Sequence, residues 1–112
     1  MILELVEFNS PKGWSRKQVA EEAHNVIPKW KANKDLLRKH FLLELNGKTG
    51  AGVYIWRSVE AAKLAHNEEW RQSVIKRTGS APTIRYFDLF LLIDNESGKV
   101  SEFPEVAEIL AA

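Results

Sequence analysis

Strand-forming and helix-forming segments alternate along this chain, and their order restricts the possible folds more than any other feature. Strands are predicted at residues 2–8, 36–45, 52–56 and 83–94, each bounded by turn-forming residues. The spacing of apolar residues predicts helices in the intervals after the first and third strands. The order βαββαβ indicates a ferredoxin-like α+β fold, with a four-stranded antiparallel sheet and both helices on one face.

Capping residues indicate where the two helices begin and end. Ser15 is typical of an N-cap, Gln18 completes a capping box, and Pro28 should end or kink the first helix. The second helix is predicted to start after Ser58 and to stop at Gly79. One stripe of this second helix, which should face the sheet, consists of Val59, Ala62, His66, Trp70 and Val74.

Length and composition indicate one globular domain, residues 1–112. We expect residues 95–112 to form a C-terminal tail, with a short helix after Pro104. The chain has 45% hydrophobic and 28% charged residues, which excludes a disordered protein. Its net charge of +1, with basic residues scattered among acidic ones, disfavours nucleic-acid binding. Thiol chemistry is excluded by the lack of cysteine. We expect a cytoplasmic protein, since no apolar run suits a membrane span or an export signal.

The apolar character of both faces of the strands predicts a homodimer. In the last predicted strand, both alternating sets of side chains are largely apolar: Ile84, Tyr86, Asp88, Phe90 and Leu92 on one face, and Arg85, Phe87, Leu89, Leu91 and Ile93 on the other. Two helices on one face would leave the second face as a large apolar patch, which monomers rarely expose. We therefore expect two copies to pack sheet to sheet.

His66 and Trp70 are the strongest local candidates for a functional site. They lie four residues apart on the predicted inward stripe of the second helix, so both should face the sheet. A neutral imidazole beside an indole in an apolar cavity suits the binding of an aromatic substrate or the movement of a proton near neutral pH. The alternative is that Trp70 belongs to the core and that His66 is a buried, hydrogen-bonded histidine.

The strands carry further candidates. Tyr54, Trp56 and Tyr86 either line a ligand cavity or simply pack in the core, because aromatic residues also favour strands. Asp88 stands among apolar residues of the last strand. Its carboxylate is expected to be solvated at the dimer rim, paired with a cation, or held as a base in a cavity, in that order of preference.

Two histidines each lie three residues from a glutamate, a spacing found in metal sites on helices. The pairs are Glu21 with His24 and His66 with Glu69. Glu21 should lie on the polar face of its helix and Glu69 away from the apolar stripe, so we expect no metal site. The sequence also contains no phosphate-binding loop and no motif typical of hydrolases.

A set of motifs extends over about two thirds of the chain: Lys39-x-Phe41, the Gly50–Trp56 strand, residues 58–62, Trp70, residues 79–82 and residues 84–88. In these motifs the chain resembles the YdhR-type monooxygenases of the dimeric α+β barrel superfamily. The pattern of that family has a Gly-Gly pair in the central strand, and Ala51 replaces the first glycine here. The motif is specific for the architecture and says little about the reaction.

The resemblance implies a homodimer whose subunits each hold a cavity between sheet and helices. Relatives oxidise phenolic or anthrone-like rings with O₂ and no cofactor, whereas others degrade haem or only bind ligands, so the resemblance implies oxidation of a small phenolic or quinol-like compound. The resemblance and the chemistry together suggest His66, Tyr54 and Asp88 as catalytic residues, and Trp56, Trp70, Tyr86 and His24 as residues that bind a small aromatic substrate. Asn67 is an alternative to His66 as the polar helix residue. The other hypotheses are a non-catalytic binder of a small molecule or haem, and a structural dimer with a filled core.

Overall fold

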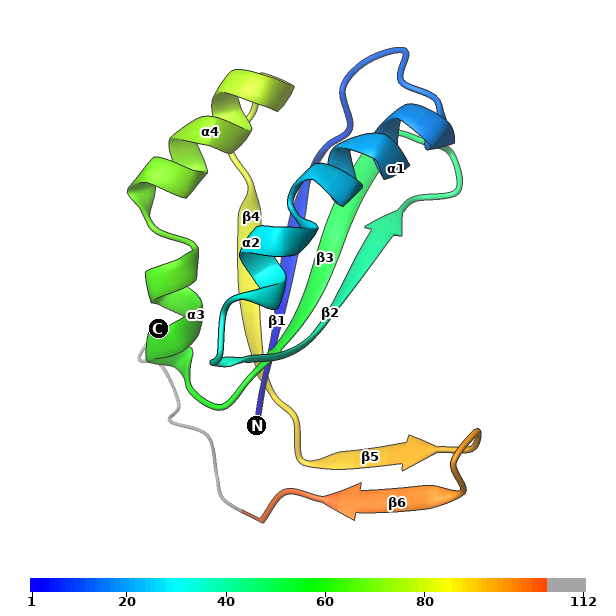
Figure 1. The fold of residues 1–112 in the computed structure, drawn as a ribbon, viewed down its shortest axis with the longest axis vertical. Helices are drawn as coiled ribbons and strands as arrows, with labels where there is room; N and C mark the ends of the chain where they lie inside the picture. The colour runs from blue at the N-terminus through cyan, green and yellow to red at the C-terminus, as the bar shows by residue number, and fades with distance from the viewer. Residues whose placement is uncertain (105–112) are drawn as a thin grey trace.

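The computed structural model of the chain describes residues 1–104, which contain ten helices and strands (Figure 1). In chain order these are β1 (Ile2–Asn9), α1 (Arg16–Asn25), α2 (Ile27–Lys31), β2 (Leu36–Leu43), β3 (Thr49–Trp56), α3 (Val59–Ala65), α4 (Glu68–Thr78), β4 (Thr83–Asp88), β5 (Leu91–Asp94) and β6 (Lys99–Glu102). The helix predicted after Pro104 lies outside the described residues.

Four strands form one antiparallel sheet in the order β2-β3-β1-β4, which confirms the predicted ferredoxin-like α+β fold. The helices lie on one face of this sheet (Figure 1). Side chains along β3 alternate between buried and half-buried, because every second residue points toward the helices. The core of the protein lies in this layer and includes Val6, Trp30, Trp56 and Ala62.

The first helix begins as predicted and ends earlier. The Ser15 hydroxyl accepts from the Gln18 backbone N–H at 3.3 Å, and the Ser15 N–H donates to the Gln18 side chain at 2.8 Å, so the capping box is present. α1 ends at Asn25, and Pro28 lies in the first turn of the short helix α2. This position suits proline, because the N–H groups of a first turn have no helical partner. α2 carries Trp30 into the core.

The second predicted helix is two helices, so the prediction of one continuous helix was wrong. α3 ends at Ala65, and Asn67 caps a new helix, α4, by accepting from the Trp70 N–H at 2.9 Å. An asparagine side chain competes with the helical backbone for its N–H groups, which explains the break. Gly79 ends α4 at a φ of 82°, as expected for a C-terminal glycine.

The last predicted strand also divides, so a single strand over residues 83–94 was wrong. β4 ends at Asp88 because its partner β1 begins at Ile2, and the Leu89 N–H bonds to the Met1 carbonyl at 2.9 Å. The chain then forms a separate hairpin of β5 and β6. The predicted tail therefore contains a strand within its described part, and the hairpin leaves Phe90 and Ile93 exposed.

The face of the sheet away from the helices is apolar at its centre. Leu3 and Leu5 of β1 lie directly opposite Ile55 and Val53 of β3, and Phe87 of β4 pairs with Leu3. Polar side chains, among them Arg85, flank this patch. None of the helices in residues 1–104 is long and apolar enough to cross a membrane.

Candidate functional site

Four polar residues form one row across the sheet. Lys39 on β2 lies opposite Tyr54 on β3, Tyr54 lies opposite Glu4 on β1, and Glu4 lies opposite Tyr86 on β4. Glu4 and Tyr54 are buried on the helix-covered face, since both belong to the buried set of their strands. The register therefore concentrates titratable groups under the helices.

Glu4 is fully buried, and two ring N–H groups bind its carboxylate. Trp56 Nε1 donates to Oε1 at 2.9 Å, and His66 Nδ1 lies 2.9 Å from Oε2. An ionised carboxylate only accepts hydrogen bonds, so Nδ1 is the donor of this pair whenever Glu4 is ionised. Sequence reasoning missed Glu4, although its position on the same face as Ile2 and Val6 was a usable signal.

His66 occupies the break between α3 and α4, and its side chain is fully buried. Its ring packs against Trp70 at 4.2 Å and against Tyr54 at 4.6 Å between ring centroids. Nε2 has no hydrogen-bond partner within residues 1–104. The imidazole therefore packs against the Tyr54 and Trp70 rings and is hydrogen-bonded to Glu4.

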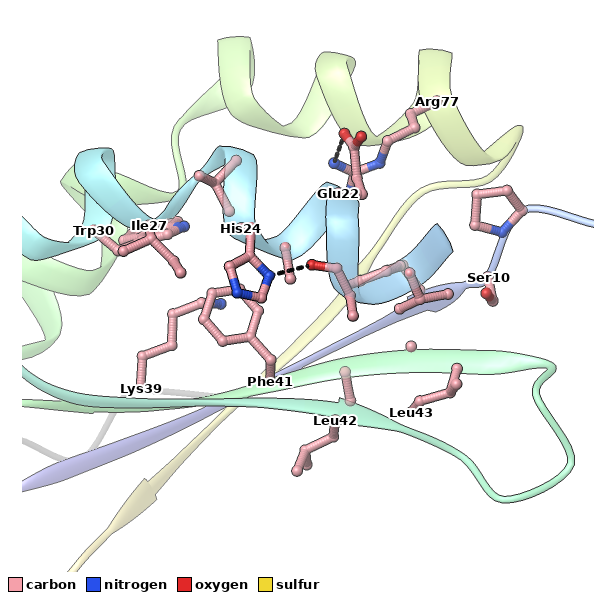
Figure 2. Close-up of a pocket in the computed structure, with 18 of the residues that line it drawn as sticks. Ser10, Glu22, His24, Ile27, Trp30, Lys39, Phe41, Leu42, Leu43 and Arg77 are labelled. Atoms are coloured by element: carbon pink, nitrogen blue, oxygen red, sulfur yellow. Dashed lines mark hydrogen bonds and ion pairs between the residues drawn. The ribbon is translucent and has the colours of Figure 1, made fainter. Parts of the chain in front are cut away.

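A cavity of about 590 Å³ lies between α1 and α2 on one side and β2 and β3 on the other. Aromatic rings line much of it, contributed by Phe8, Trp14, Trp30, Phe41, Tyr54 and Trp70. Figure 2 shows His24 and Trp30 reaching in from the helices, and Lys39 and Phe41 rising from β2 below them. The volume falls within the range of small-molecule sites.

Two glycines let rings lie against the backbone of β3. A Cβ at Gly52 would stand 2.8 Å from a Tyr54 ring carbon and 3.1 Å from Lys39 Nζ, and one at Gly50 would stand 2.7 Å from the Phe8 ring. The approaches to the two rings are closer than Cβ atoms normally show, and the approach to Lys39 Nζ is tight. The packing of Phe8 against Gly50, and of Tyr54 and Lys39 against Gly52, thus depends on the absence of these two side chains.

Lys39 is the most perturbed cation of the site. Its amine donates to the Tyr54 hydroxyl and lies 3.8 Å from the Tyr54 ring centroid and 4.0 Å from that of Phe41. Burial lowers the pKa of Lys39 to about 7; Lys29 and Arg77 act in the same direction, and Glu4 opposes them. In the sequence, Lys39 is recognisable only as part of the Lys39-x-Phe41 motif of the fold.

The two tyrosines of the row keep their protons. Burial raises the pKa of Tyr54 well above its ordinary value, and the Glu4 carboxylate adds to this effect. The same two causes raise the pKa of Tyr86 to about 12. At neutral pH the Tyr54 hydroxyl inside the cavity is therefore a hydrogen-bond donor rather than a base.

Positive charge dominates the cavity wall. Its cationic side chains are Arg16, Lys29, Lys39 and Arg77, whereas Glu22 is its one carboxylate in the described part of the chain. Glu22 lies 3.8 Å from Arg77 (Figure 2). Lys29 and Lys39 both lie near the Trp30 ring, at 4.9 and 5.1 Å from its centroid. The cavity therefore favours a ligand with negative charge.

The structure brings only part of the predicted site together. Tyr54, Trp70 and His24 line the cavity. His24 Nδ1 lies 2.8 Å from the Ala20 carbonyl, a bond in which the ring nitrogen is the donor. The remaining predicted residues do not line it: His66 and Trp56 bind Glu4 in the core, Tyr86 packs against that core, and Asp88 is exposed at the end of β4.

The members of the two pairs with metal-ligand spacing lie in different surroundings. His66 is turned inward to Glu4, whereas Glu69 is exposed, and Glu21 is exposed on α1. Over residues 1–104, no three His, Asp or Glu side chains come together as a metal site.

Solved structures share this fold. A Bordetella bronchiseptica protein provisionally named an antibiotic biosynthesis monooxygenase superposes with a TM-score of 0.63 and 14% identity, over 80% of this chain and 97% of its own. A Streptomyces coelicolor monooxygenase in complex with nanaomycin D gives 0.60 and 14%, over 77% and 84%. A further antibiotic biosynthesis monooxygenase gives 0.61 and 11%, over 80% and 98%.

These similarities show that the chain has the ferredoxin-like α+β fold of antibiotic biosynthesis monooxygenases. At such low identity they show the fold alone. The sequence matches no protein-family model and no curated protein sequence.

Proposed function

We propose that this protein is a YdhR-type monooxygenase that oxidises a small phenolic or quinol-like compound with O₂ and without a cofactor. The observation that carries the proposal is the cavity of about 590 Å³, which combines aromatic walls with a reactive amine, Lys39, and a protonated hydroxyl, Tyr54. A cavity of this size argues against the structural dimer with a filled core.

The walls suit a flat aromatic substrate. Trp30, Phe41 and Tyr54 surround the Lys39 amine, and Trp70 on α4 also lines the cavity. Rings of this kind bind other rings by offset or edge contacts and exclude water. Exclusion of water protects an ionised ring from being protonated again before it meets O₂.

The chemistry requires few groups from the protein. O₂ reacts directly with an electron-rich phenolate or carbanion, so the protein must bind the ring, accept its proton and stabilise the oxyanion. A ring C–H and the O–H lose their hydrogens, one oxygen atom enters as a carbonyl and the other leaves as water, so the substrate supplies all the electrons. We assign the donor role to the Tyr54 hydroxyl, which keeps its proton at neutral pH and would donate to the oxygen of the substrate.

The fold neighbours support this assignment by their names. The Streptomyces coelicolor neighbour is a monooxygenase with nanaomycin D bound, and the other two carry the name of antibiotic biosynthesis monooxygenases. Their activities are properties of those proteins. For this chain, the ring-lined cavity is the independent support.

The test is O₂ consumption with phenols, hydroquinones and anthrones in the presence of EDTA. We expect O₂ uptake with formation of a quinone absorbance, and a loss of at least about tenfold for Tyr54→Phe, because one oxyanion donor is removed. Glu69→Gln is a matched control, since Glu69 is exposed and outside the cavity wall. Ligand binding without O₂ uptake for any of these compounds would contradict the proposal and favour a binding protein.

One observation favours haem binding as the second candidate function. His24 donates through Nδ1 to the Ala20 carbonyl, which leaves Nε2 as the nitrogen available to a ligand at the cavity wall. A histidine held in this way is the usual haem ligand. Titration with hemin tests it: a shifted Soret band that is lost in His24→Ala supports the haem candidate, and an unshifted band removes it.

We further propose that two copies pair through the apolar face of the sheet. Leu3, Leu5, Val53 and Ile55 form the centre of that face, which the helices leave uncovered. Burial of apolar surface is the main driving force for such pairing. The exposed apolar residues of the β5–β6 hairpin add to the surface available to a second copy.

A further inference from the structure

Lys39 is a cavity cation without an anionic partner in the described chain. Its one hydrogen bond is to the neutral Tyr54 hydroxyl, and no carboxylate within residues 1–104 forms an ion pair with it. The carboxylate in the same row, Glu4, is already bound by Trp56 and His66. Burying an ammonium group without a counter-charge is costly, so the site is electrostatically incomplete.

The rest of the cavity does not supply the missing charge. Glu22, its one carboxylate in the described part, lies beside Arg77. The titratable and charged groups around Lys39 are Tyr54 on β3, Glu4 on β1, Glu22 and His24 on α1, Lys29 on α2, and Arg77 on α4. Cations outnumber acids on the cavity wall, so a neutral ligand would leave it positively charged.

We propose that the cavity binds aromatic oxyanions and that Lys39 takes up a proton to become their counter-cation. The ligand class is a flat ring that carries a carboxylate, or a phenol whose oxygen is ionised on binding. The inference deepens the proposed function and rests on it for the cavity as the substrate site. It adds the chemical class of the substrate and the group that receives its proton.

The surroundings of Lys39 leave its neutral and charged forms close in free energy near neutral pH, so a bound anion can shift the amine to the charged form. Burial opposes the charged form, Glu4 favours it and the neighbouring Lys29 and Arg77 oppose it, and together they lower the pKa of Lys39 to about 7. The faces of the Phe41 and Tyr54 rings favour the charged form when it is present. An oxyanion beside the amine adds a direct attraction in a site with little water, and so raises the pKa of Lys39.

The two sources of the oxyanion differ in their proton balance. A carboxylate is already ionised above pH 7, so its binding transfers a proton from solvent to the neutral amine. A phenol brings its own proton: its O–H bond breaks, an N–H bond forms on Lys39, and solvent gains or loses none. Affinity for a carboxylate should therefore fall about tenfold per pH unit above pH 7 and be nearly constant below it.

The experiment compares 2-naphthoate with the neutral 2-naphthamide, and with 2-naphthol as the phenol, by tryptophan quenching and calorimetry. We expect 2-naphthoate to bind at least about tenfold more tightly than the amide near pH 7. At pH 8, calorimetry in phosphate and in Tris should show proton uptake for 2-naphthoate and none for 2-naphthol. Lys39→Met should abolish the preference, whereas Lys34→Met, which alters an exposed lysine outside the cavity, should not.

A second variant guards against a folding defect. Lys39→Arg keeps a permanent positive charge, so it should retain tight binding of 2-naphthoate without proton uptake and without the pH dependence. Equal affinity for 2-naphthoate and the amide, or a preference that survives in Lys39→Met, would overturn the inference. If the protein prefers 2-naphthoate to the amide but takes up no O₂, this inference stands and the proposed monooxygenase activity is contradicted. If it takes up O₂ but shows no such preference, the monooxygenase proposal stands and this inference is contradicted.

Discussion

Replacing His66 with leucine tests whether the buried Glu4–His66 pair stabilises the fold. Both side chains are fully buried, with Nδ1 and Oε2 2.9 Å apart. Removing one partner of such a pair costs about 3–5 kcal/mol, because the other charge stays buried and unpaired. Leucine also removes the unpartnered Nε2 atom, and the loss of the desolvation cost of that atom stabilises the variant by about 1–3 kcal/mol. We expect a net loss of about 2 kcal/mol in the free energy of unfolding, or roughly 8–16 °C in Tm.

Urea unfolding followed by tryptophan fluorescence at neutral pH measures this loss. The double variant Glu4→Leu/His66→Leu should be more stable than the sum of the single changes indicates, because it leaves no buried charge behind. His24→Leu is the matched control, since His24 is exposed and bonds only to its own helix. A His66→Leu protein as stable as the parent, or more stable, would refute the role assigned to the pair.

Three further predictions concern the cavity, the uncovered face of the sheet and the helix break. Gly52→Ala should weaken binding of 2-naphthoate and cost about 1–3 kcal/mol in stability, because the added methyl group meets Tyr54 and Lys39; unchanged affinity would contradict the close packing. Val53→Lys should convert a dimer into monomer or aggregate in light scattering, and a parent mass of 12.8 kDa would remove the dimer proposal. Asn67→Ala should lower stability by about 1 kcal/mol in urea unfolding through loss of the α4 cap, and no change would show that the cap is dispensable.

The parts of the fold that depend on local sequence could be predicted. The capping box of Ser15 and Gln18 involves atoms three residues apart, and the order of the four sheet strands and of the helical segments between them follows from the spacing of apolar residues. The position of Trp70 on an inward stripe was also a local pattern. These features do not depend on which distant segments meet in the folded protein, and the structure confirms them.

The features that depend on register could not be predicted. The row from Lys39 to Tyr86 exists only because β2, β3, β1 and β4 pair in one alignment. Glu4 and His66 are 62 residues apart, and no local pattern connects them. β4 stops at Asp88 because β1 begins beside it at Ile2, a limit set by a distant strand. Of the aromatic residues that line the cavity, the sequence therefore indicated Tyr54 and Trp70 as site residues, and it did not reveal the roles of Glu4 and Lys39.

Because of the two glycines of β3, the sheet side of the cavity is stiffer than the helix side. At Gly50 and Gly52, the rings of Phe8 and Tyr54 lie directly on the main chain of a strand paired on both sides. The ladder hydrogen bonds to both neighbouring strands hold this side of the cavity in place. The opposite wall consists of side chains on α1 and on the five-residue helix α2, which can shift as units. Ligands of different thickness should therefore be accommodated by movement of these helices, while the strands keep Phe41 and Tyr54 in place around Lys39.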